Sequence, residues 1–226
     1  MLTKIFDIAY GGAGVGKTED NRIVFVPYTI KDELVDVSVV KDKKKYLEAK
    51  LNSVVEPSAY RINPLCKYYM SCGGCQYMHI DYEQEVISKE NQLRNSFKRI
   101  GGINQELDIN VIPSLKHSFY RNSLTLHRTG KNNAGFYSKN NKDIINIEEC
   151  AIADEKINEV ISNKGIGNAF KLNSKIDKIT VKTDGKNRYT PEYAVCVIPA
   201  DHQGGIGPQS VIPVNNEISV VDALDI

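Results

Sequence analysis

The chain has 226 residues, of which 41% are hydrophobic and 25% charged, as in an ordinary globular protein with one large domain or two small ones. A net charge of +1 argues against a strongly basic nucleic-acid binder, so any RNA contact must come from a local basic face. No apolar run reaches the roughly 18–20 residues that span a bilayer, and the N-terminus does not resemble a signal peptide. We therefore expect a cytoplasmic protein without membrane contact, whose five cysteines indicate a metal site or catalysis rather than disulfides.

Residues 1–56 have the pattern of several short β-strands. Apolar and polar residues alternate around residues 5–10, 35–39 and 47–51, and Ile23–Val26 is a short buried-strand run that Pro27 ends. Glycines or charged residues separate these segments. The pattern predicts a small closed barrel over residues 1–56.

One segment of this region matches a nucleotide-binding pattern. Gly11–Thr18 fits the P-loop spacing G-x-x-x-x-G-K-T, but a P-loop needs a following helix whose N-terminus helps to hold the phosphates. Here Glu19 and Asp20 follow, and then a strand that ends in Pro27. We interpret the segment as a Gly-rich barrel loop and rank a nucleotide hydrolase last among the possible functions.

A linker with Pro57 and Pro64 leads to the strongest helix signal in the chain, over residues 81–100. Asp81 is suited to cap its N-terminus, Gln84 stands at the capping-box position, and Gly101-Gly102 ends it. An apolar stripe along one face consists of Tyr82, Val86, Leu93, Phe97 and Ile100.

The rest of the chain alternates strand and helix signals. Strands are expected at Ser123–His127, Gly135–Tyr137, Asp143–Ile147, Ile179–Val181 and Tyr193–Ile198, and a helix at Asp154–Ile161. The last two strands resemble a hairpin joined by the turn-rich Asp184–Asn187. We predict an α+β domain over residues 57–200 and a poorly defined tail over residues 201–226.

Four cysteines carry most of the functional information. Cys66, Cys72 and Cys75 have the spacing C-x5-C-x2-C, and Cys150 lies far downstream. Such thiolates suit a soft metal or an iron–sulfur cluster, and the Gly-Gly pair before Cys75 lets the backbone wrap closely around it. Structural zinc, which favours C-x2-C pairs, and plain buried cysteines remain alternatives.

Two further residues receive a structural interpretation. Cys196 lies between valines in a strand pattern and is interpreted as a core cysteine. His79, four residues after Cys75, is interpreted as a hydrogen-bonded histidine rather than a ligand.

Together these motifs resemble the RNA uracil-5-methyltransferase family over about residues 1–200. The resemblance rests on Cys66–Gln76 with the helix after it, on Phe119-Tyr-Arg121-Asn122, and on Gly135–Cys150. The segment Tyr10–Pro27 is similar to a TRAM domain, an OB-like barrel that grips RNA. Asp32 departs from the pattern, because a glycine is typical there.

The resemblance implies an iron–sulfur type of enzyme that transfers a methyl group from S-adenosylmethionine to uracil C5 of 23S rRNA or tRNA. In the family a cysteine nucleophile and a glutamate base act on a flipped-out base, within a doubly wound methyltransferase domain. No signal for that domain follows residue 200, so we expect it to be missing and assign no catalytic residue. In the family the helix over residues 81–100 packs on that domain.

Our leading hypothesis is the RNA-binding and cluster-bearing N-terminal part of such an enzyme, monomeric and without catalytic activity of its own. Cys66, Cys72, Cys75 and Cys150 would hold a 4Fe–4S cluster, whereas S-adenosylmethionine would bind only the full-length enzyme. Lys17, Gln76, Arg121 and Asn122 are the candidate RNA contacts. The alternative is a stand-alone RNA-binding module with zinc on the four cysteines.

Overall fold

The computed structural model describes residues 1–130, 133–162, 166–167, 170, 177–183, 194–197, 211–215 and 217–218, the last three ranges as backbone only. The chain forms two compact units. The first contains Met1–Met70 and Cys75–Leu115, and the second contains Ser71–Gly74 and Lys116–Ile226. Among the described residues, no helix has both the length and the apolar character that crossing a membrane requires.

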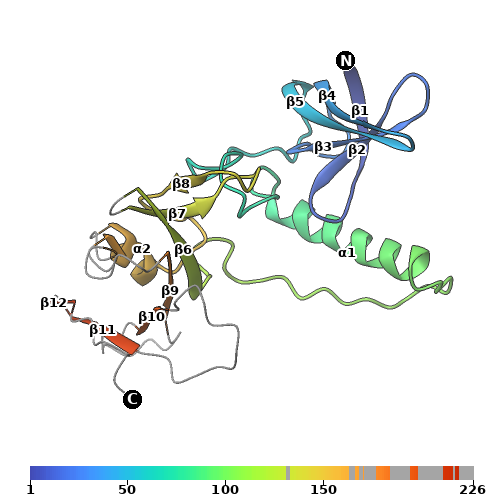
Figure 1. The fold of residues 1–226 in the computed structure, drawn as a ribbon. Coiled ribbons are helices and arrows are strands. Elements are labelled where there is room, and N and C mark those ends of the chain that lie inside the picture. The colour runs from blue at the N-terminus through green and yellow to red at the C-terminus, as the bar shows by residue number, and fades with distance from the viewer. Residues whose placement is uncertain are drawn as a thin grey trace. The chain divides into compact units, whose positions relative to one another are not determined.

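Five strands of the first unit close into a β-barrel (Figure 1). They are β1 (Leu2–Ile8), β2 (Ala13–Lys17), β3 (Ile23–Pro27), β4 (Leu34–Lys43) and β5 (Tyr46–Glu56). The order is β1-β2-β3-β5-β4, with β4 pairing back to β1. β3 and β5 are parallel, and the other neighbours are antiparallel. The barrel predicted for residues 1–56 is therefore confirmed.

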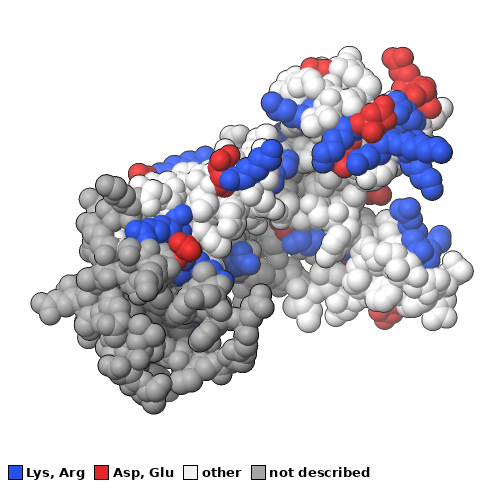
Figure 2. Space-filling model, viewed as in Figure 1, with Lys and Arg blue, Asp and Glu red and all other residues white. Residues whose placement is uncertain are grey.

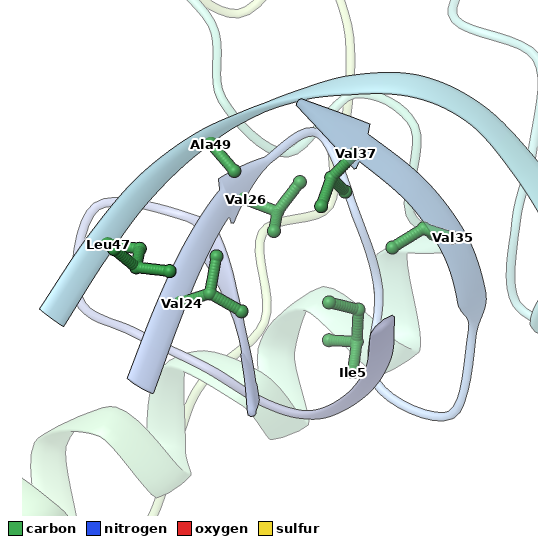
Figure 3. Packing of buried hydrophobic residues seen from close by; sticks show 7 residues of the cluster. All are labelled: Ile5, Val24, Val26, Val35, Val37, Leu47 and Ala49. Carbon is green, nitrogen blue, oxygen red and sulfur yellow. The ribbon is translucent and has the colours of Figure 1, made fainter. Parts of the chain in front are cut away.

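The barrel interior is filled by small branched side chains that alternate along the strands. Figure 3 shows seven of them pointing inward: Ile5, Val24, Val26, Val35, Val37, Leu47 and Ala49. All seven are buried. Because successive side chains in a strand point to opposite faces, the residues between them lie on the outside of the barrel.

The glycines of the P-loop-like segment have a packing role in this interior. Gly14 and Gly16 lie on β2 and are buried. A Cβ atom at Gly14 would lie 2.0 Å from Oγ1 of Thr29, and one at Gly16 would lie 2.3 Å from Cγ2 of Thr3. The next element is strand β3 and not a helix, so the segment belongs to the barrel as predicted, but Ala13–Lys17 form strand β2 where a loop was expected.

Helix α1 (Tyr82–Arg99) also belongs to the first unit. The side chain of Asp81 caps it by accepting a hydrogen bond from the backbone N–H of Glu83, at 3.0 Å. Its buried residues are the polar Ser88 and Gln92. The Gln92 side chain donates to the carbonyl of Ile8 on the barrel at 3.3 Å and accepts from the hydroxyl of Tyr77 at 3.1 Å.

The second unit is built on a seven-stranded sheet with the order β12-β11-β10-β9-β6-β7-β8. Its strands are β6 (Ser123–Thr129), β7 (Asn133–Tyr137), β8 (Ile144–Asn146), β9 (Lys178–Lys182), β10 (Ala194–Val197), β11 (Val211–Asn215) and β12 (Glu217–Ile218). Helix α2 (Glu155–Ser162) buries Ile157, Val160 and Ile161. All neighbouring strands are antiparallel.

The predicted elements of this unit occur within a few residues of their expected places. β9 and β10 form the predicted antiparallel pair, whereas the turn predicted at Asp184–Asn187 lies outside the described residues. Cys196 lies in β10, where only the backbone is described. The tail predicted from residue 201 contributes β11 and β12 to the sheet, and its other residues lie outside the described part of the chain.

Candidate functional site

The four predicted metal ligands are cysteines outside disulfides, with partly buried side chains. Cys66 and Cys75 belong to the first unit, and Cys72 and Cys150 to the second. A hydrogen bond of 3.0 Å from the backbone N–H of Tyr69 to the carbonyl of Cys66 starts the turn that leads towards Cys72.

Cys72 is held by backbone hydrogen bonds to the end of strand β7. It forms an isolated antiparallel bridge with Ser138, and the N–H of Gly73 donates to the carbonyl of Tyr137 at 3.0 Å. The N–H of Gly74 lies 3.4 Å from Sγ of Cys72 and donates to it. Hydrogen bonds of this kind stabilise a thiolate that binds a soft metal.

Cys150 is held by one side chain from helix α2. The backbone N–H of Cys150 donates to Oδ1 of Asn158 at 2.7 Å, and the amide of Asn158 donates to the carbonyl of Cys150 at 3.0 Å. The N–H of Ala153 donates to the same carbonyl at 3.0 Å. The Cys150 backbone is therefore fixed on both sides of its side chain.

The donor chemistry of these cysteines suits a cluster, because all four carry thiols outside disulfides and one of them accepts an N–H donor. Within the described residues, however, no three His, Cys, Asp or Glu side chains gather closely enough to hold a metal ion. The predicted ligand set therefore stays a prediction.

A buried polar network in the first unit lies beside the loop that carries Cys66, Cys72 and Cys75. The hydroxyl of Tyr69 lies 2.6 Å from Nδ1 of His79 and 3.0 Å from the carbonyl of Gln76. The ring of Tyr28 packs edge-on against Tyr69 at 5.3 Å between centroids, and its hydroxyl donates to the carbonyl of Met70. These contacts connect both ends of the loop to the barrel, and the hydrogen-bonded role predicted for His79 is confirmed.

Burial sets the protonation states in this network. It lowers the pKa of His79 to about 4, Arg61 adds to the effect, and the Thr29 carbonyl acts against it. Burial also raises the pKa of Tyr69, and the nearby Tyr28 raises it further. Both side chains are therefore neutral at pH 7. The Nε2 atom of His79 has no hydrogen-bond partner among the described residues.

An ion pair that the sequence analysis missed lies next to this network. Glu33 is 0% exposed, and its carboxylate accepts from the guanidinium of Arg61 at two nitrogens, one of them at 2.8 Å. The same carboxylate accepts from the backbone N–H groups of Ile30 and Ser58. Arg61 also donates to the carbonyl of Tyr28 at 2.9 Å. No local pattern reveals such a pair, because its partners lie far apart in the sequence.

The four predicted RNA contacts are all exposed and lie in different units. Lys17 ends strand β2 and Gln76 follows Cys75, both in the first unit. In the second unit, Arg121 forms a parallel bridge with Ala153, and the carbonyl of Asn122 accepts from the N–H of Thr183. Arg121 and Asn122 are neighbours in the sequence and lie in the second unit, whereas Lys17 and Gln76 lie in the unit that contains the barrel.

Charge is unevenly distributed on the barrel. Figure 2 shows Lys and Arg side chains gathered over the barrel in this view, with acidic side chains among them. Several of the cations are paired, as Arg22 is with Asp20 and Asp42, and Lys41 with Glu48. The cations of the barrel are therefore interspersed with acids that pair with several of them.

Comparison with known proteins supports the expected family. Residues 4–51 match the TRAM domain family, and the match covers strands β2–β4 and parts of β1 and β5. An uncharacterised RNA methyltransferase of Aquifex aeolicus is 39% identical over 154 residues, which are 68% of this chain and 36% of that protein. One from Nostoc sp. is 36% identical over 162 residues, which are 70% of this chain and 35% of that protein.

A relative with a specific name extends this similarity. The 23S rRNA (uracil(1939)-C(5))-methyltransferase of Pseudoalteromonas translucida is 31% identical over 160 residues, covering 69% of this chain and 36% of that protein. The chain thus spans about a third of the length of the relatives it matches.

A solved structure shares the fold. The tRNA (uracil-54, C5)-methyltransferase of Pyrococcus abyssi, solved with S-adenosyl-L-homocysteine, superposes with a TM-score of 0.52 at 22% identity. The superposition covers 85% of this chain and 44% of that one. Over about two thirds of its length the chain is homologous to RNA methyltransferases, one of which is named as a 23S rRNA uracil-5-methyltransferase, and its barrel matches the TRAM domain.

Proposed function

We propose that this chain is the RNA-binding and cluster-bearing part of an S-adenosylmethionine-dependent RNA uracil-5-methyltransferase that acts on 23S rRNA or tRNA. The TRAM match over residues 4–51, on a barrel that closes as expected, is the observation that carries the proposal. RNA is the proposed partner and the cytoplasm the proposed location.

Cys66, Cys72, Cys75 and Cys150 are the proposed ligands of a 4Fe–4S cluster. The spacing of the four cysteines and the N–H donor to the Cys72 sulfur support this assignment. When bound, the cluster would order the loop that carries Cys66, Cys72 and Cys75 and would transfer no electron. Asn158 then holds the backbone of Cys150 in place, and Tyr69 connects the loop of the other three cysteines to the barrel.

Helix α1 is the proposed contact with the methyltransferase domain of the full-length enzyme. The helix turns its polar residues Ser88 and Gln92 inward and leaves apolar Leu93, Phe97 and Ile100 exposed. Exposed apolar side chains in one row are typical of a face that another domain covers. The relatives are about three times as long as the matched part, so they have room for such a domain.

Two measurements on the 226-residue protein test the proposal. We expect it to bind single-stranded RNA in a fluorescence anisotropy titration and to transfer no methyl group to uracil, because four of its five cysteines are assigned to the cluster and the fifth, Cys196, is interpreted as a core residue. Failure to bind any RNA would contradict the binding role, and methyl transfer by this chain would contradict the assignment of its cysteines.

Metal analysis separates the cluster from zinc. Protein purified without oxygen is expected to be brown and to contain iron and acid-labile sulfide. Cys72→Ser should lose the iron, whereas Cys196→Ser, in strand β10, is the matched control and should retain it. A colourless protein with stoichiometric zinc would instead support the stand-alone zinc module.

A further inference from the structure

The outer face of strands β1 and β2 has side chains unlike those of the barrel interior. Thr3 and Ile5 of β1 point inward and are buried. Lys4, which lies between them, and Phe6, which follows Ile5, are exposed. Lys17 at the end of β2 is exposed as well. Phe6 is 43% exposed, which is unusual for a phenylalanine in the middle of a strand.

A β-bulge presents the Phe6 ring to solvent. Ile5 pairs with Gly16 and Asp7 pairs with Val15, so Phe6 has no partner on β2. Bulges of this kind redirect a side chain and occur often beside functional sites. The ammonium group of Lys17 lies 5.8 Å from the centre of the Phe6 ring, which places a cation beside an exposed aromatic face.

Two lysines of this surface lie opposite each other on adjacent strands. Lys4 precedes Ile5 and Lys17 follows Gly16, and Ile5 and Gly16 are paired in an antiparallel register. Like charges opposite each other destabilise a strand pair, and among the described residues neither lysine has a salt-bridge partner. A bound anion between them would remove this repulsion.

More aromatic surface continues on the neighbouring strands. Phe25 of β3 pairs with Val15 of β2, and Val24 and Val26 on either side of it point inward. Phe25 and Tyr46 of β5 are in edge-on contact at 5.5 Å between ring centres. The outer face therefore carries an aromatic ring, a pair of lysines and an aromatic pair.

We propose that this outer face, consisting of Lys4, Phe6, Lys17, Phe25 and Tyr46, binds single-stranded RNA, with a base stacked on Phe6 and a phosphate between the two lysines. The inference rests on the proposed RNA-binding function and specifies its substrate as unpaired nucleotides. A stacking ring needs a base that is free of its own stack, which a duplex does not offer. The charge of the lysines matches the phosphate, and the rings match bases of any sequence.

The test compares a labelled oligonucleotide of ten uridines and adenines with its duplex by fluorescence anisotropy. Phe6→Leu should weaken single-strand binding roughly fivefold to a hundredfold, as expected for the loss of one stacked base, and should leave duplex binding unchanged. Phe6→Tyr retains the ring and should restore the affinity. Tyr60→Leu, at an exposed aromatic residue outside the barrel strands, is the matched control.

The lysines are tested through the salt dependence of binding. Lys4→Ala and Lys17→Ala should each reduce the slope of log affinity against log salt by about 0.7, as for the loss of one phosphate contact on a single strand. Lys50 is an exposed lysine of β5 and pairs with Ser38 of β4. Lys50→Ala should therefore leave the slope unchanged. Circular dichroism checks that each variant is folded.

The outcomes separate this inference from the proposed function. If the wild-type chain binds no RNA, both fail. If it binds RNA but Phe6→Leu behaves like Tyr60→Leu and Lys17→Ala behaves like Lys50→Ala, the RNA-binding function stands and this surface is excluded. Equal affinity for the duplex, unaffected by Phe6→Leu, would also overturn the inference.

Discussion

Substituting Gly14 with alanine tests whether the P-loop-like segment serves barrel packing or nucleotide binding. The added Cβ would lie 2.0 Å from Oγ1 of Thr29 and 3.0 Å from Cγ2 of Ile5. Thr29 cannot move away easily, because it is 0% exposed and its hydroxyl donates to the carbonyl of Val26 at 2.8 Å. One methyl group must therefore displace either the β2 backbone or a buried, hydrogen-bonded side chain.

The expected cost has two parts. Inserting a carbon into a filled core costs about 1–3 kcal/mol. Breaking the Thr29 hydrogen bond inside the barrel adds about 1–3 kcal/mol, because the hydroxyl and the carbonyl would both stay buried. We therefore expect Gly14→Ala to lower the free energy of unfolding by about 2–6 kcal/mol, out of the roughly 5–15 kcal/mol of a typical domain.

Urea unfolding followed by tyrosine fluorescence measures this change, since the chain has 12 tyrosines and no tryptophan. Val15→Ile adds the same single carbon on the outer side of β2 and is the matched control, with an expected change below about 0.5 kcal/mol. Lys17→Ala should also leave stability unchanged. A Gly14→Ala protein as stable as the wild type, together with ATP binding that Lys17→Ala abolishes, would refute the packing explanation.

Three further predictions concern the buried polar groups. Glu33→Ala should cost about 3–5 kcal/mol of stability in urea unfolding, because it leaves Arg61 and two backbone N–H groups unpaired, and an equal stability of the variant would contradict this. His79 has a pKa of about 4 in the folded protein, below its value of 6.5 in the unfolded chain. The contribution of neutral His79 to the free energy of unfolding is therefore complete above pH 6.5 and is lost as the pH falls towards 4. His79→Phe should abolish this part of the pH dependence, worth about 3 kcal/mol, in unfolding curves measured at several pH values. Asn158→Ala should cost about 1–3 kcal/mol and speed the reaction of Cys150 with a thiol reagent, relative to Ser162→Ala on the exposed end of the same helix.

Local patterns predicted the elements of the fold well, because alternation and capping are properties of neighbouring residues. The alternation around Ile5, Val35 and Leu47 places these side chains inside the barrel, and Asp81 caps helix α1 as its sequence indicates. At position 32 the family prefers glycine, and the backbone there has φ of 71°, a left-handed conformation that aspartate tolerates better than most residues.

Contacts between distant residues could not be predicted in this way. The apolar stripe of α1 suggested which face would pack, yet the residues that the helix buries are Ser88 and Gln92, because the barrel offers the carbonyl of Ile8 as a hydrogen-bond acceptor. The burial of Glu33 depends on Arg61, and no periodicity connects the two. The metal ligands were chosen by spacing and resemblance, and they remain a prediction for the same reason.

The path of the chain through the cysteine motif constrains how this protein can be divided. The backbone leaves the first unit after Met70, contributes Ser71–Gly74 to the second, and returns at Cys75. A single cut therefore cannot separate the units: a fragment ending at residue 115 would carry residues 71–74 away from Ser138, to which Cys72 pairs. Fragments intended for spectroscopy or crystallisation must keep this four-residue excursion together with strand β7, or replace it with a linker.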